Sequence, residues 1–114
     1  MTAALPMPRR RGGGFLAGAG GRLLPASVPL RWFGAAALCH ALAWPVLAAG
    51  AAQWSSWRGG LGWPLAALHL VTLGTLVTSA IGASLQLLPV ATHQPVRWPR
   101  SAALLWWLWL PGLA

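Results

Sequence analysis

The sequence predicts an all-α membrane protein with two antiparallel transmembrane helices and a partial third helix. Of its 114 residues, 57% are hydrophobic and only 7% are charged, whereas a soluble domain is about 25% charged. The hydrophobic residues form long uncharged runs of a length suited to a bilayer. The basic residues lie outside these runs, as expected for side chains that contact phospholipid headgroups.

The composition also excludes several kinds of chemistry. The chain contains no Asp or Glu, and its eight basic residues are all Arg, which gives a net charge of +8. Without carboxylates it cannot form an acid–base pair, a Ser-His-Asp triad or an oxygen-rich Mg²⁺ or Ca²⁺ site. We therefore expect no catalysis by this chain alone. The arginines flank apolar runs, which favours lipid over nucleic acid as their partner.

Residues 1–30 are predicted to form a flexible, basic, cytoplasmic tail, and residues 31–114 the transmembrane region. The tail contains a run of three arginines, Arg9 to Arg11, followed by a glycine-rich stretch of low helix propensity. A signal peptide is the alternative interpretation. However, the apolar stretch Phe15–Ala19 is shorter than the roughly 7–15 residues that such a signal requires.

Two uncharged runs predict the two spans, at about residues 32–52 and 61–90. Pro45 lies inside the first run, where a membrane helix tolerates a kink. The second run is longer than a bilayer requires, so we expect tilt or an extension past the interface. Pro64 suits the first turn of that helix and Pro89 its end.

A third apolar run, residues 101–114, predicts a helical stub. Fourteen residues rise roughly 21 Å, less than the ~30 Å hydrocarbon core. Five arginines precede the first span, one lies between the spans and two follow the second. The positive-inside rule then predicts a cytoplasmic N-terminus. We expect a multi-pass protein of the bacterial inner membrane.

The tryptophans are expected to mark the membrane interfaces, because indole rings favour the headgroup level. Trp44, which precedes Pro45, is the exception and is expected to pack in the kink. The residues assigned to the inner interface are Trp32 and Trp98, and those assigned to the outer interface are Trp54, Trp57 and Trp63.

Small and polar residues line one side of the second span if residues 68–90 form a regular helix. One set recurs at spacings of 3, 4, 3 and 4 and covers about 80° of the circumference. A second set recurs every four residues and permits close helix approach. The first set is Thr72, Thr75, Ser79, Gly82 and Gln86, and the second is Gly74, Thr78 and Gly82. We expect this face to pack against other helices.

Of the three histidines in the sequence, two are candidates for function. His69 begins the polar face of the second span, and an ionisable residue inside a bilayer is a functional candidate. Neutral imidazole binds haem iron through one ring nitrogen, and a hydrogen bond to a neighbouring helix is the alternative role. His40 lies at a similar depth in the first span and is a weaker candidate for a second ligand. His93 is interpreted as a residue at headgroup level.

The second span contains the string His69-Leu70-Val71-Thr72-Leu73-Gly74, followed by Gly82, Gln86 and Leu87-Leu88-Pro89-Val90. This pattern resembles a segment of the haem-copper oxidase subunit I-like membrane proteins, which include the NnrS-type proteins of nitric-oxide metabolism. The first span and the residues before it, from Val28 to Phe33, are similar to the N-terminal helix of that family. The resemblance covers roughly residues 28–100. It implies that His69 is an axial haem ligand.

Three histidines are too few for a six-coordinate haem and a histidine-rich copper centre, so the chain is not expected to be a complete oxidase. The first interpretation is a non-catalytic membrane segment that binds haem iron through His69 and no other metal. The alternatives are a small structural or assembly subunit without a cofactor, and a truncated gene product. The expected partners are the lipid bilayer and other transmembrane helices or a second copy of the chain, with no nucleic acid.

Overall fold

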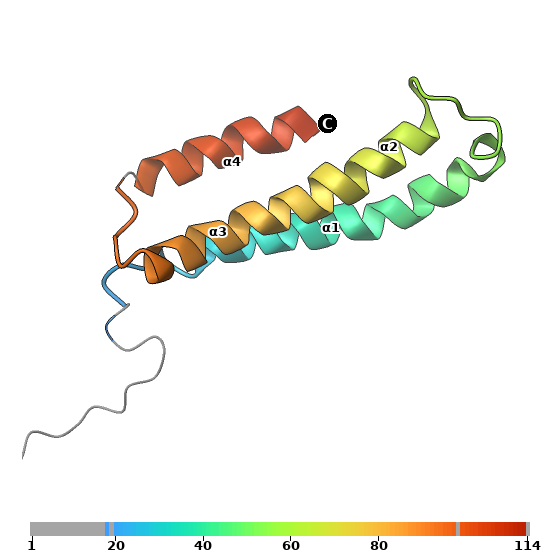
Figure 1. Ribbon diagram of the computed structural model, residues 1–114. Coiled ribbons are helices and arrows are strands. Elements are labelled where there is room, and N and C mark those ends of the chain that lie inside the picture. The colour runs from blue at the N-terminus through green and yellow to red at the C-terminus, as the bar shows by residue number, and fades with distance from the viewer. Residues whose placement is uncertain (1–17, 19, 98, 114) are drawn as a thin grey trace, which may run out of the picture.

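The computed structural model describes residues 18, 20–97 and 99–113, and all regular structure within them is helical. Two long helical stretches lie antiparallel, and a shorter helix lies alongside them (Figure 1). The elements in chain order are α1 (Ser27–Ala49), η1 (Ala51–Gln53), α2 (Trp63–His69), η2 (Leu70–Val77), α3 (Thr78–Ala91) and α4 (Pro99–Leu113). Because α2, η2 and α3 are continuous, the chain forms a hairpin with a third helix attached.

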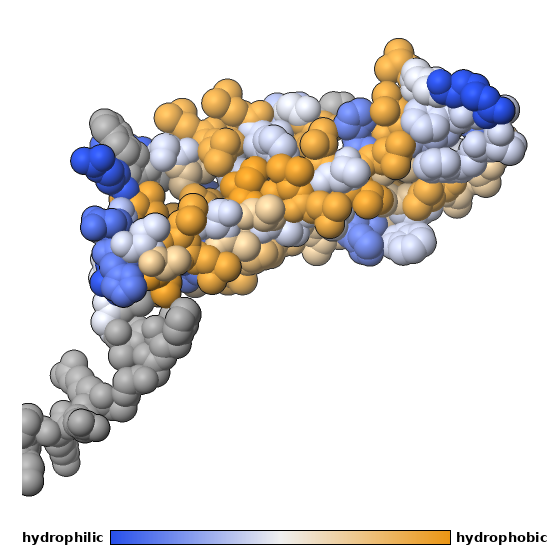
Figure 2. Space-filling view, in the orientation of Figure 1, coloured by the Kyte–Doolittle hydropathy of each residue, from blue (hydrophilic) through white to orange (hydrophobic). Residues whose placement is uncertain are grey.

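Both arms of the hairpin are long and apolar enough to cross a membrane. Helix α1 has 23 residues, and the continuous stretch Trp63–Ala91 has 29. Figure 2 shows hydrophilic side chains at the two ends of the helices and a mostly apolar surface between them. Helix α4 has 15 residues, so at about 1.5 Å per residue it is shorter than the ~30 Å hydrocarbon core.

The first helix begins earlier than the apolar run that predicted it. It starts at Ser27 rather than near residue 32, and it ends at Ala49. Pro29 lies in the first turn, where a missing N–H costs little, and Arg31 Nε donates to the Ser27 carbonyl over 3.3 Å. The start of the apolar run therefore did not mark the start of the helix. Residues 27–30 are helical, and residues 1–17 of the predicted tail lie outside the described part of the chain.

Three glycines bring the arms of the hairpin together. A Cβ atom on Gly74 would lie 2.7 Å from the Cys39 Cβ, and one on Gly82 would lie 2.8 Å from the Trp32 Cβ. At the closed end of the hairpin, a Cβ on Gly50 would lie 2.7 Å from the Cβ of the first residue of α2. Real Cβ atoms essentially never approach so closely. The absent side chains therefore fix the antiparallel register of the two arms.

The middle of the second arm is wound more widely than an α-helix. Residues Leu70–Val77 form a π-helix, an arrangement that is rare and usually short. The hydroxyls of Thr75 and Thr78 donate to carbonyls five residues earlier, those of Leu70 (3.0 Å) and Leu73 (2.9 Å). The regular 100° rotation assumed for residues 68–90 therefore does not hold across η2.

Helix α4 is attached to both arms by tryptophans. The Trp106 ring meets the Trp32 ring of α1 edge-on, with centroids 5.1 Å apart. Trp109 Nε1 donates to the Thr78 hydroxyl of α3 over 2.9 Å. The Arg31 guanidinium lies 5.8 Å from the Trp106 ring centroid, within range of a cation–π interaction.

Trp32 is a core residue rather than an interfacial one. Its exposed fraction is 0%, because it lies between Gly82 and Trp106. Trp44 also differs from its prediction. It is 62% exposed and its ring meets the His40 ring at 5.8 Å, so it does not pack into a kink at Pro45.

Candidate functional site

His69 ends α2, and its side chain is exposed on the outside of the hairpin. Its Nδ1 atom lies 3.1 Å from the carbonyl oxygen of Leu65, one turn earlier in the same helix. A carbonyl can only accept a hydrogen bond, so Nδ1 carries the proton when the ring is neutral. Nε2 then has a bare lone pair, and it forms no hydrogen bond within the described residues.

His40 lies in α1, on the arm opposite His69. Its ring is exposed and meets Trp44. Cys39 lies against Gly74, so in the antiparallel hairpin His40 is level with residue 73 of the second arm. His69 is four residues from that level, which is roughly 6 Å along the helix axis at 1.5 Å per residue. No group of three or more His, Cys, Asp or Glu residues is present in residues 18, 20–97 and 99–113.

His93 lies at the end of the second arm, two residues beyond α3. It is exposed, its Nδ1 lies 3.4 Å from the Ala91 carbonyl, and its backbone has a φ of 58°. These features describe a turn residue at the surface.

The small and polar residues of the second arm divide into three groups by burial. Those that are buried, against α1 and in one case beneath Trp109, are Gly74, Thr78 and Gly82. Those that are half-buried are Thr75, Ser79 and Gln86. Thr72 is exposed, and its hydroxyl donates to the Leu68 carbonyl over 2.6 Å. The close-packed face therefore contacts helices of the same chain.

Comparison with protein-family models, with curated proteins and with solved structures gives no match. The functional argument therefore rests on the geometry of the described residues. An axial haem site requires from one chain a single neutral imidazole with an exposed, unpaired nitrogen and a fixed ring. In His69, Nδ1 lies within hydrogen-bond distance of the Leu65 carbonyl oxygen, and the residue is exposed.

Proposed function

We propose that the protein is an integral membrane subunit that presents His69 as an axial haem ligand to a cofactor shared with other transmembrane helices. The supporting observation concerns the two ring nitrogens of His69, an exposed residue on an apolar helix. Nδ1 is already hydrogen-bonded to the Leu65 carbonyl, which leaves Nε2 as the nitrogen that can bind iron. Hydrocarbon offers no hydrogen-bond partner to such an atom. Intramembrane histidines therefore mark functional sites.

In this proposal the chain supplies position and basicity. The Leu65 carbonyl orients the ring and makes Nε2 a stronger ligand. A haem bound there would supply one-electron transfer. The proposal includes placement in a bacterial inner membrane. The distribution of the eight arginines favours an orientation with a cytoplasmic N-terminus.

The haem proposal is tested by titrating the detergent-purified protein with haemin. A Soret band is expected to develop, and added imidazole should shift it by supplying a further ligand. The variant His69→Ala should lose the band, whereas His40→Ala and His93→Ala should retain it. A band that survives in His69→Ala, or a wild-type protein that gives none, would contradict the proposal.

A subunit without a cofactor is the second candidate. It is favoured by the large exposed surface of the two arms. In the apolar 18-residue stretch of each arm, only 17% of the residues of the first and 22% of those of the second are buried. Such surfaces contact lipid or further helices. Cross-linking in native membranes, followed by gel analysis, tests this candidate. A stable oligomer or complex that forms equally well in His69→Ala and in haem-deficient cells would favour it over the haem proposal.

A further inference from the structure

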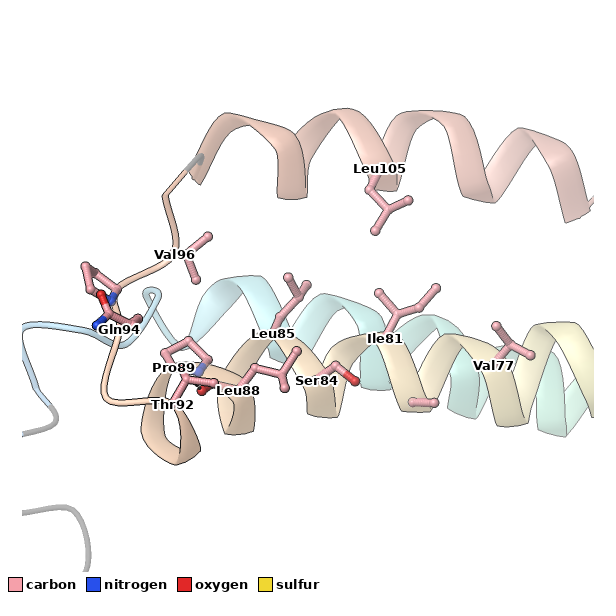
Figure 3. A pocket seen from close by; sticks show the side chains of 12 residues that line it. Val77, Ile81, Ser84, Leu85, Leu88, Pro89, Thr92, Gln94, Val96 and Leu105 are labelled. Carbon is pink, nitrogen blue, oxygen red and sulfur yellow. Dashed lines mark hydrogen bonds between the residues drawn. The ribbon is translucent and has the colours of Figure 1, made fainter.

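Helices α3 and α4 enclose an apolar groove of about 500 Å³ at the end where the two helices are joined. Figure 3 shows Ile81 and Leu85 of α3 pointing across it toward α4, and Leu105 of α4 pointing back toward α3. The connection between the helices closes one end of the groove through Val96. No other described segment fills this space.

Polar residues line the groove near the connection between the helices, and two arginines follow them in the sequence. Thr92 and Gln94 line it and are exposed. They are followed by the exposed residues Arg97 and Arg100, which form no hydrogen bond with other described residues. Since the sequence has no Asp or Glu, no side-chain carboxylate of this chain can pair with them.

Two further arginines lie at the same end of the molecule, where α1 begins, α3 ends and α4 begins (Figure 1). Arg22 has a buried Nε atom with no hydrogen-bond partner in the described part of the chain. Arg31 lies over Trp106. This arginine-rich end (Arg22, Arg31, Arg97 and Arg100) contrasts with the opposite end, where Arg58 is the arginine of the described connection.

We infer that the groove binds an anionic diacyl phospholipid, with one acyl chain between α3 and α4 and the phosphate beside Arg97 and Arg100. A side chain from a second copy of this chain would fill the groove but leave the guanidinium groups without a side-chain carboxylate as counter-charge, since the sequence has no Asp or Glu. A free phosphate would pair with the guanidinium groups but leave the groove empty. A lipid with an anionic headgroup fills the apolar groove with an acyl chain and pairs its phosphate with the guanidinium groups. The inference rests on the membrane placement proposed above and is independent of haem.

The charge of the headgroup should decide the affinity. Each basic residue near an anionic lipid surface contributes about fivefold in affinity at moderate ionic strength. Two arginines therefore predict a preference of about 25-fold for a lipid with net negative charge over a zwitterionic lipid with the same acyl chains.

The experiment measures lipid adducts of the detergent-purified full chain by native mass spectrometry. Phosphatidylglycerol and phosphatidylcholine with identical acyl chains are titrated in parallel. We expect phosphatidylglycerol to bind about 25-fold more tightly. The double variant Arg97→Gln/Arg100→Gln should lose this preference, and the matched control Arg58→Gln should keep it.

A second pair of variants tests the groove itself. Leu105→Trp places a large ring between the helices and should reduce the binding of both lipids. Leu87→Trp, at an exposed position of α3 that does not line the groove, should not. Circular dichroism confirms that each variant remains helical.

Equal binding of the two lipids would overturn the inference, as would an equal loss of preference in Arg58→Gln. Competition by inorganic phosphate with no effect of Leu105→Trp would reduce the site to a free-anion site. Failure of the membrane placement would be seen separately, as release of the protein from membranes by alkaline carbonate.

Discussion

His93 adopts a backbone conformation that suits glycine better than histidine. With φ at 58°, it lies in the left-handed region just after α3, where helices commonly end in glycine. A side chain there costs roughly 1 kcal/mol. The variant His93→Gly is therefore expected to raise the free energy of unfolding by up to about 1 kcal/mol, measured by thermal unfolding in detergent.

The matched control is His93→Ala, which removes the imidazole but keeps the Cβ atom. It should give no stabilisation. If both variants stabilised the protein equally, the imidazole rather than the backbone would be the source of the cost.

At the residue scale, sequence reasoning depended on local patterns. The four-residue spacing of Gly74, Thr78 and Gly82 indicated a close-packed face, and the structure buries all three. It failed for Trp32, because the burial of this ring depends on Gly82 and Trp106, which are distant in the sequence. The role of His69 remains a prediction.

Close approach of the two arms makes Gly82 sensitive to substitution. In Gly82→Ala the new Cβ would lie 2.8 Å from the Trp32 Cβ, so the arms must separate. Overpacking of this kind costs about 1–3 kcal/mol. We expect a corresponding loss of thermal stability in detergent.

Gly34 of α1 provides a matched control, since a Cβ atom there meets nothing within 4 Å. Gly34→Ala should be neutral or stabilise the helix by up to about 1 kcal/mol through its higher helix propensity. Equal effects of the two substitutions would show that contact between the arms does not limit stability.

The positions of the helices could be predicted from the hydrophobicity of the sequence, whereas the π winding of η2 could not. The two predicted spans and the stub correspond to α1, to Trp63–Ala91 and to α4, with ends shifted by a few residues. An apolar run shows where a helix can be buried in lipid, but it carries no signal that separates α from π winding. The π-helix is accompanied by threonine hydroxyls that donate to carbonyls five residues earlier, and a search for 100° periodicity does not detect this arrangement.

At the scale of the whole molecule, α4 is attached to the hairpin by a few specific contacts. The Trp109–Thr78 hydrogen bond joins residues 31 positions apart. Trp109→Phe keeps most of the ring and removes the donor, which should cost about 1 kcal/mol. The expected result is a lower unfolding temperature and faster proteolysis after α3.

Trp107 is the neighbouring control because it is 71% exposed. Trp107→Phe should leave both measurements unchanged. Equal sensitivity of the two variants would show that the hydrogen bond does not hold α4 in place.

The hairpin itself was predictable, because a short connection between two spans makes them antiparallel neighbours. The position of α4 was not, since it depends on an indole N–H and a buried hydroxyl that no local pattern connects. The groove between α3 and α4 follows from that position, so it was also hidden from sequence reasoning.

Thr78 connects the packing of α4 to the winding of η2, two features that are distant in the sequence. Its hydroxyl accepts from Trp109 and donates to the Leu73 carbonyl within η2. Such a shared hydroxyl makes the two bonds mutually strengthening. Coupling of this kind is reciprocal. Packing of α4 against the hairpin therefore stabilises the π-helix η2, and the π-helix stabilises the packing of α4 by the same free energy. A disturbance of the C-terminal helix is thereby transmitted to the turn that immediately follows His69.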